Sequence, residues 1–468
     1  MTQSAPSSST ASSPAPAEQL AIEQAQLLAD IANRPPLRRA AAYIRLSGPG
    51  WLQGAMTLGG GSAIASLTIG GVYGYELLWV QPLAMLVGCI MLFALSHQTL
   101  STGEAPFKAM SRVHPALAWS WAVAALASSI IWGFSHYPLS AGMAEEVIAV
   151  STGFQVDDSG GREAYLFALA LVIWGFCAYT AWHYGKGGKT VQLFENGIKW
   201  LSFFTVLAFA WVVINASWSG QVDWSKVLRG FIPGNLPTDS QGVTTVMAAL
   251  GAAVGINMTF VYGYTLLNRG WGKAHRELSR YDIVIGLVLP YILVTTLISI
   301  AAASVLSHSD ADISGKLSPA MASQIFVQAG LSEISGRLIF SLGILGMAVG
   351  SLVMHMLTCG FAASEMFGWP TNSLRYRLAL LLPTPAVLGV FVWSTMGAYV
   401  VLPTSAICGA LLPIAYVGWL LLNNRREYLG NDMPIGQRQK LYNLAMLLCI
   451  LTVVASVSYT TAVKMGWL

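Results

Sequence analysis

Apolar stretches alternate with short polar segments along almost the whole chain. Their approximate bounds are 48–73, 77–98, 116–136, 164–183, 194–216, 243–268, 281–305, 337–366, 377–394, 396–422 and 441–465. A helix needs about 20 residues to cross a hydrocarbon core of about 30 Å, and it satisfies its own backbone hydrogen bonds there. The pattern therefore predicts an all-α polytopic membrane protein with about eleven transmembrane helices.

Composition agrees with a chain surrounded by lipid. Hydrophobic residues make up 55% of the 468 residues and charged residues only 10%, whereas roughly 25% of a soluble domain is charged. The formal net charge of +4 is small, and the sequence shows no basic footprint for nucleic acid. We therefore expect a lipid bilayer as partner, and no nucleic acid.

The cysteines are interpreted as packing residues. All five lie inside apolar stretches and form no CxxC pair: Cys89, Cys177, Cys359, Cys408 and Cys449. Disulfide frameworks and thiolate metal sites have recognisable cysteine spacings that are absent here. We expect neither of them, and no cofactor.

The chain divides into a short N-terminal tail and one membrane domain. Residues 1–18 are rich in Ser, Ala and Pro, without the basic start and apolar stretch of a signal peptide. The segment 17–33 has the pattern of a short amphipathic helix, either on the membrane surface or solvated. We expect residues 1–45 to form a cytoplasmic tail and residues 46–468 to form the transmembrane domain.

The distribution of charge predicts the orientation of the chain, because cytoplasmic loops of membrane proteins are rich in Lys and Arg. With a cytoplasmic N-terminus, that side holds most of the 25 basic residues: Arg34, Arg38, Arg39, Arg45, Lys108, Arg112, Lys186, Lys189, Lys199, Arg269, Lys273, Arg276, Arg280, Arg375, Arg377, Arg425, Arg426, Arg438 and Lys440. The opposite loops carry acids: Glu145, Glu146, Asp157, Asp158, Glu163, Asp310 and Asp312. We expect a bacterial inner-membrane protein with its C-terminus outside.

Two of the predicted helices carry interruptions near their middle. The first contains three consecutive glycines, Gly59 to Gly61, which cost about 2 to 3 kcal/mol of helix propensity relative to alanine. The sixth contains Gly255 and Asn257 at the corresponding depth. Paired interruptions of this kind indicate a transporter built from inverted repeats, with its substrate between half-helices. The alternative, that small residues only permit close helix packing, is favoured for Gly54, Gly70 and Gly350.

Several segments resemble the Nramp family of divalent-metal transporters. They are GPGWL at 48–52, GYELLWV at 74–80, LGAAV at 250–254, HRELSRYDIVIGL at 275–287 and the stretch 340–368. The resemblance covers roughly residues 45 to 465. It implies the LeuT-type fold, in which two inverted five-helix repeats are followed by one further helix. It also implies secondary transport by alternating access.

The metal ligands of that family are replaced in this chain. Aligned without gaps from GPG, the family's DPGN motif falls on Gly59 to Ser62, and its Met-Pro-His falls on Gly255 to Asn257. A divalent cation in lipid needs several oxygen, nitrogen or sulfur ligands, usually including a carboxylate. The family's known site is therefore not expected to hold Mn²⁺ or Fe²⁺ here.

The family's proton-coupling residues are also replaced, by Ala125, Trp132 and Tyr262. Ionisable groups remain at Glu365 and His355 in the cytoplasmic half of the eighth stretch, and at His136 near an external end. Such groups are costly in a membrane and are candidates for function, although each is equally compatible with a hydrogen-bonded structural role. The coupling ion, Na⁺ or H⁺, stays open. Freed carbonyls near Gly59 and around Gly350, Ser351 and Thr358 are candidates for Na⁺.

We expect the glycines to enlarge the central cavity, which favours a small organic solute as substrate. The expected substrate-binding residues are Gly59, Gly60, Gly61, Ser62, Gly255, Asn257, Thr259, Phe260, Tyr262 and Trp132. Free N–H groups at the start of the second half-helix suit a carboxylate, with Ser62 as cap and donor. An organic cation held by Trp132, Phe134 and Tyr137 ranks second.

Three other functions stay open or are disfavoured. A divalent-metal transporter for Mg²⁺ or Mn²⁺ with altered ligands is the alternative within transport. A non-transporting sensor on a transporter fold is a second alternative, although the chain shows no sizeable signalling domain. An enzyme is not expected, because no HExxH or GxSxG motif and no paired intramembrane acids occur.

Overall fold

The computed structural model describes residues 26–156, 159–184, 188–234, 236–305, 322, 325–327, 330–392 and 400–467. Within these residues all regular structure is helical. Ten helices are long and apolar enough to cross a membrane, and one bent pair makes up to eleven. The predicted all-α architecture and number of spans are confirmed.

The spanning elements follow the predicted order. They are α3 (Pro49–Thr57) with α4 (Gly60–Tyr73), α5 (Val80–Thr102), α7 (Pro115–Thr152), α8 (Ser159–His183), α9 (Gly188–Trp218), α11 (Ser240–Ala253) with α12 (Ile256–Asn268), α13 (Arg276–Ile283) with η2 (Val284–Val288) and α14 (Leu289–Val305), α16 (Glu333–Phe367), α17 (Leu374–Ala379) with η4 (Thr384–Gly389), α19 (Val401–Ala410) with α20 (Leu412–Asn423), and α22 (Gly436–Lys464). Short helices between them are α2 (Pro36–Leu46), α6 (Pro106–Val113), α10 (Trp224–Gly230) and α21 (Arg426–Leu429).

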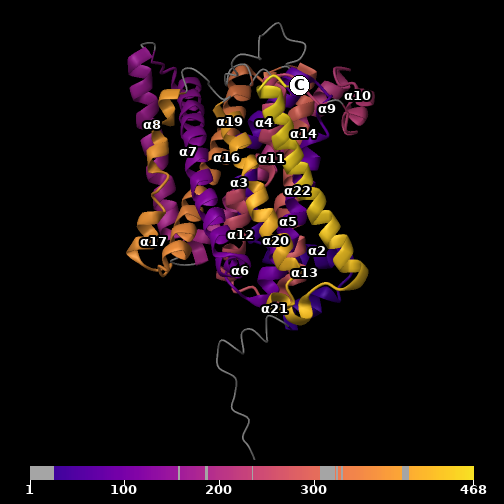
Figure 1. Cartoon of the computed structure of the whole chain (residues 1–468). Helices are drawn as coiled ribbons and strands as arrows, with labels where there is room; N and C mark the ends of the chain where they lie inside the picture. The colour runs from indigo at the N-terminus through magenta and orange to yellow at the C-terminus, as the bar shows by residue number, and fades with distance from the viewer. Residues whose placement is uncertain are drawn as a thin grey trace, which may run out of the picture.

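The long helices form one bundle, and its two ends differ (Figure 1). The short helices α2, α6 and α21 lie at one end, together with α17, whereas α10 and the C-terminus lie at the other. Because the number of crossings is odd, α2 and the C-terminus lie at opposite ends of the bundle. The basic residues of α2, α6, α17 and α21 therefore lie together at one end, as the predicted alternation of loops requires.

Some sequence predictions fall outside the described residues. The N-terminal helix is described only from residue 26, with Leu28 and Ile31 buried. The remainder of the predicted tail, before residue 26, lies outside the description. So do four of the predicted external acids, Asp157, Asp158, Asp310 and Asp312.

The third span is longer than predicted. We expected it to end at residue 136, but α7 continues through Pro138 to Thr152. The acids Glu145 and Glu146 suggested a loop, yet each forms an ion pair with an arginine of another segment. Glu145 lies 2.8 Å from Arg162, and Glu146 pairs with Arg337. As a result His136 lies well inside a long helix and not near its end.

Small residues let the two halves of the first span pack closely on the seventh. A Cβ atom on Gly54 would overlap the carbonyl oxygen of Gly286, and one on Gly70 would overlap that of Ser299. The packing role predicted for these two glycines is confirmed. At the start of α3, the buried Asp282 carboxylate accepts hydrogen bonds from the backbone N–H groups of Gly48 and Gly50, at 2.9 and 2.5 Å.

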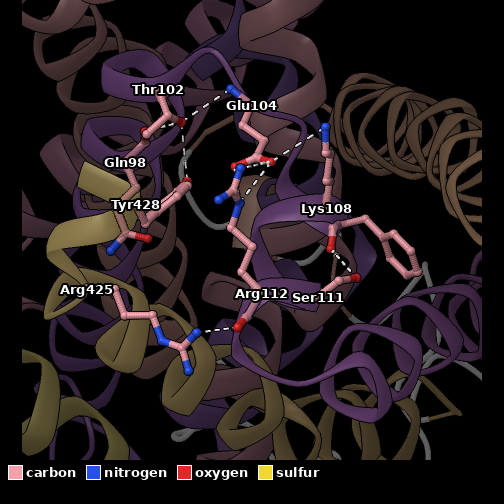
Figure 2. Close-up of polar contacts among 9 residues, drawn as sticks. Gln98, Thr102, Glu104, Lys108, Ser111, Arg112, Arg425 and Tyr428 are labelled. Carbon is pink, nitrogen blue, oxygen red and sulfur yellow. Dashed lines mark hydrogen bonds and ion pairs between the residues drawn. The ribbon is translucent and has the colours of Figure 1, made fainter. Parts of the chain in front are cut away.

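A charged cluster holds the linker between the second and third spans at the end that carries α6 and α21. Figure 2 shows Lys108 and Arg112 turned towards Glu104. Arg112 donates to the Glu104 carboxylate at 3.0 to 3.1 Å, and Lys108 lies 3.9 Å from it. Arg425 donates to the backbone carbonyl of Arg112. We call these four residues the end cluster.

Candidate functional site at the two helix breaks

The first span breaks where its glycine run predicted. Helix α3 ends at Thr57, helix α4 begins at Gly60, and the two axes differ by 50°. Gly59 is extended, with φ −83° and ψ −176°, so a side chain would fit its backbone conformation. Space is what requires the glycines. A Cβ on Gly60 would overlap Leu139, and one on Gly61 would overlap Trp132.

Neighbouring side chains lie beside the glycine run, where we expected an enlarged central cavity. Helix α7 approaches the break closely, and Trp132, His136 and Leu139 occupy the space that the missing side chains leave. A separate cavity of about 20 Å³, lined by Leu58, Ser202 and Gly350 and not by these glycines, has room for about one water molecule. The glycines therefore allow side chains of α7 to lie close to the break.

The sixth span breaks at Val254 and Gly255, between α11 and α12. The Asn257 side chain accepts a hydrogen bond from the backbone N–H of Met258 at 3.0 Å. The thioether of Met258 folds back to the break, where it accepts from the N–H of Gly255 at 3.3 Å. The alignment without gaps removed the thioether from this site, and the structure corrects that inference, because Met258 supplies one from a later position.

The two breaks touch each other. The hydroxyl of Thr57, the last residue of α3, donates to the carbonyl of Ala253, the last residue of α11, at 2.9 Å. The same hydroxyl lies 3.4 Å from the sulfur of Met258. Thr57 and Ala253, which adjoin the two breaks, are both buried. The half-helices of the first and sixth spans therefore meet at one polar point inside the bundle.

Two histidines from other helices lie at this point. His136 comes from α7 and His355 from α16, and their ring centroids are 5.6 Å apart. Trp132 stacks on His355 at a centroid distance of 6.0 Å and meets His136 edge-on at 5.0 Å. All three side chains are buried. We call His136, His355, Asn257, Ser351 and Trp132 the central cluster.

Hydrogen bonds fix the proton on His355. The Asn257 oxygen already accepts from Met258, so its NH₂ group is the donor to Nδ1 of His355, at 2.9 Å. The proton of His355 is therefore assigned to Nε2. That nitrogen donates to Oγ of Ser351 at 3.1 Å, and Ser351 points towards the carbonyl of Met56 at 3.4 Å.

His136 has the opposite arrangement. Its Nδ1 lies 3.0 Å from the backbone carbonyl of Trp132 and 3.2 Å from Oγ of Ser135. The Ser135 hydroxyl itself donates to the Trp132 carbonyl, so both oxygens accept and Nδ1 is assigned the proton. This leaves Nε2 as a bare lone pair. Among the described residues this buried nitrogen has no hydrogen-bond partner. A buried polar atom without a partner costs about 1–3 kcal/mol and calls for an explanation.

The other predicted site residues divide into two groups. Ser62 lies at the first break, where its hydroxyl donates to the carbonyl of Thr57 at 2.6 Å. Thr259, Phe260 and Tyr262 are directed elsewhere. Thr259 accepts from the Trp121 indole and Phe260 packs on that ring, whereas the Tyr262 hydroxyl meets Ser279 at 3.2 Å.

Acidic metal ligands do not gather in the described part of the chain. No group of three or more His, Cys, Asp or Glu side chains among the described residues could hold a metal ion. Glu365 lies in the last turns of α16, beyond His355. Any ion at the breaks therefore has to be held by imidazole, thioether, amide, hydroxyl and backbone oxygen groups.

Comparisons with known proteins agree with this architecture. The model of the natural resistance-associated macrophage protein-like family matches residues 50–461. A "Divalent metal cation transporter MntH" from Chromohalobacter salexigens is 23% identical over 442 residues, covering 90% of this chain and 91% of that protein. A mutant of the Eremococcus coleocola manganese transporter has a TM-score of 0.69 at 16% identity, with 93% and 90% coverage. Mhp1, a nucleobase-cation-symport-1 family transporter, has a TM-score of 0.55 at 14% identity, with 88% and 92% coverage.

Proposed function

This chain belongs to the natural resistance-associated macrophage protein (Nramp) family and has the LeuT-type fold, and we propose that it carries a divalent metal cation across the membrane. The sequence prediction of a transporter stands, because members of this family are transporters. The finer prediction of a small organic solute has no support from the relatives, whose names specify metal cations. Trp132, His136 and Leu139, which fill the space beside the glycines, also count against it.

The meeting of the two breaks carries this proposal. Transporters with broken helices bind their substrate near the midplane, between the half-helices. Here that point gathers the Met258 thioether, two imidazoles and the hydroxyls of Thr57 and Ser351. Imidazole and thioether groups suit first-row transition metals. The set is smaller than a dedicated metal site, so the cation keeps part of its water shell.

In this proposal, α3 is the segment that moves during alternating access. The half-helix is held at one end by Asp282 of α13 and is separated from α4 by the extended Gly59. Opening towards the end that carries α2 and α13 requires α3 to leave Asp282, with the break as the hinge. Closure would restore these hydrogen bonds.

The remaining assignments follow the charge pattern of the loops. We propose an inner-membrane location with the α2 end cytoplasmic and the C-terminus outside, because the basic loops lie at the α2 end. Residues 1–45 then form the cytoplasmic tail, and residues 46–468 form the transport domain. The coupling ion is left open between Na⁺ and H⁺.

Uptake into proteoliposomes tests the proposed function. Purified full-length protein is reconstituted into vesicles that contain a metal-sensitive dye, and Mn²⁺, Zn²⁺ or Co²⁺ is added outside. We expect saturable entry above that into protein-free vesicles, with no competition from amino acids, amines or carboxylates. Saturable uptake of a radiolabelled organic solute, without metal entry, would overturn the proposal and restore the prediction from sequence.

A further inference from the structure

We propose that a cavity between α5, α11 and α22, at the end of the bundle that carries α10 and the C-terminus, binds an acyl chain of an anionic phospholipid. The cavity has a volume of about 480 Å³, which is within the range of about 300–1,000 Å³ for ligand pockets. We call it the outer cavity. Its lining includes no residue of the central cluster, so this binding site is separate from the proposed metal site.

Apolar side chains form most of the wall of the outer cavity. Val243, Val246 and Leu250 are spaced three and four residues apart on α11, so they share one face of that helix. Val80 and Leu83 add a second apolar wall from the start of α5. Such a surface suits a hydrocarbon chain, because the burial of apolar surface is favourable and requires no hydrogen-bond partner.

Most of the polar side chains in the cavity come from α22. Thr452, Ser456 and Thr460 recur every four residues and therefore lie along one face of the helix. The Thr452 hydroxyl donates to the carbonyl of Leu448 in its own helix at 2.9 Å. It therefore needs no partner from an occupant of the cavity.

The walls of the outer cavity are held by contacts of their own. The Tyr459 hydroxyl of α22 donates to the carbonyl of Pro237, in the segment before α11, at 3.3 Å. On the α5 side, Trp79 and Val80 belong to a small apolar core that includes Ile69 of α4. The walls are therefore held in place by the protein itself.

The cavity extends from the end of the bundle towards its middle. Thr460 lies about one turn before Lys464, the last residue of α22, and Thr452 lies about 18 Å before it along the helix. On α11, Leu250 lies three residues before Ala253, where the helix ends at the break. A chain that enters beside Thr460 thus reaches well into its half of a hydrocarbon core about 30 Å thick.

The surroundings of α22 indicate where the occupant comes from. Leu441, Leu444, Leu448 and Leu451 are all exposed on this helix, which is long and apolar enough to cross the membrane. Large apolar side chains on the outside of a spanning helix face lipid. Acyl chains of the bilayer are therefore the apolar molecules next to the outer cavity.

The residues at the end of α22 indicate the head group. Lys464 lies four residues after Thr460, so it follows the cavity residues on the same face of the helix, and its side chain is exposed. Lysine side chains extend to the membrane interface, and the exposed Trp467 is typical of that level. A lysine there attracts a phosphate group. The hydroxyls of Ser456 and Thr460, nearer the middle, suit the ester carbonyls of a phospholipid.

Photolabelling of the reconstituted full chain tests this site. The vesicles consist of phosphatidylcholine with a small fraction of phosphatidylglycerol that carries a photoreactive diazirine in its acyl chain, and mass spectrometry identifies the labelled peptides. We expect more label on residues 243–250 and 452–460 than on α9, whose Phe203 and Phe204 are exposed. Ser456→Phe places a large side chain in the cavity and should reduce the label on residues 243–250 severalfold.

Ser458→Phe is the matched control. Ser458 lies on the same helix, is exposed and does not line the cavity, so this variant should be labelled like the wild type. A ligand of the native state raises its apparent stability. Added phosphatidylglycerol should therefore raise the thermal unfolding temperature of the wild type and of Ser458→Phe more than that of Ser456→Phe. The unfolding curves without lipid also show whether each variant is folded.

Competition between lipids tests the head group. Unlabelled phosphatidylglycerol should displace the photoreactive lipid more strongly than unlabelled phosphatidylcholine does, because only the first has a net negative charge. Lys464→Gln should reduce this difference. Equal competition by the two lipids in the wild type would overturn the anionic head group.

Two outcomes would overturn the site itself. One is equal labelling of residues 243–250 in the wild type and in a folded Ser456→Phe variant. The other is label spread evenly over α9, α11 and α22 in the wild type. Metal uptake is measured separately, so the failure of the lipid site would leave the proposed function standing.

Discussion

The central cluster and the end cluster are both polar, but the end cluster consists of paired charges and the central cluster of neutral groups. The end cluster pairs Glu104 with Arg112 and Lys108 at the surface of the bundle (Figure 2). The central cluster consists of neutral groups, and it leaves Nε2 of His136 without a partner among the described residues. Charges at the surface are matched within the protein, whereas this buried lone pair faces the break in the first span.

This difference indicates which cluster has a binding role. A surface ion pair contributes about 0–1 kcal/mol to stability, and its residues are satisfied by one another. A buried acceptor without a donor costs stability in the empty state, and binding a cation recovers that cost. Variants in the central cluster should therefore change transport, and variants in the end cluster should change only stability.

The largest effect is expected from Gly59→Ala. Its methyl group would occupy the point between His136, Ser351 and Met56, and overpacking of this kind costs about 1–3 kcal/mol. Metal uptake into proteoliposomes should fall at least about tenfold. Gly343→Ala in α16 is the control, because a Cβ there meets nothing within 4 Å. Equal uptake by the two variants would contradict the central role of Gly59.

A smaller loss of transport is expected from Asn257→Ala. This change leaves Nδ1 of His355 without its donor, at a cost of about 1–3 kcal/mol. The Met258 N–H loses one of its two acceptors and keeps the Gly255 carbonyl. Metal uptake should fall severalfold, with a lower thermal unfolding temperature. Asn215→Ala in α9, whose amide donates to the Trp211 carbonyl of its own helix at 2.9 Å, should behave as wild type. A wild-type rate for Asn257→Ala would remove this residue from the site.

The end cluster should respond differently to Glu104→Gln. This variant loses the ion pair with Arg112, whose side chain is half exposed, so the stability change should stay below about 1 kcal/mol. The thermal unfolding temperature should fall slightly, and metal uptake should remain within about twofold of wild type. A large transport defect would show that the end cluster takes part in gating.

The smallest effect concerns Asp432, at the same end of the bundle. Hydrogen bonds from Lys273, and next from Arg276, hold the pKa of Asp432 below its ordinary value of 3.8. The stability that these pairs contribute is present above that value and is lost as the pH falls through the lowered pKa. Asp432→Asn should therefore unfold at a slightly lower temperature between pH 5 and 8. The difference should shrink below about pH 4, and a difference that persists there would contradict it.

Hydrophobic pattern and glycine content were enough to predict the spans and both breaks, because these properties are local. The length of α7 was not, since Glu145 and Glu146 are matched by arginines distant in sequence. Contacts between helices decide whether such acids lie in a loop or on a helix. Two neighbouring acids look the same in the sequence in either case.

The candidate site was predicted only in part. The sequence located the breaks, with Gly59, Ser62 and Asn257, but it could not show whether the glycines opened a cavity or admitted a neighbouring helix. Their closeness to His136 depends on the packing of α7, and His355 reaches the site through α16. The available signal was one histidine in each of these two apolar stretches, together with Ser351 one turn before the second.

Anomalous diffraction from crystals grown with Zn²⁺ or Mn²⁺ tests the central claim most directly, because it locates the metal without reference to sequence. We predict one strong peak where the two helix breaks meet, near the Met258 thioether, the Thr57 hydroxyl and the imidazoles of His136 and His355. A peak only at surface carboxylates such as Glu104, or ordered organic density between the breaks, would contradict the account.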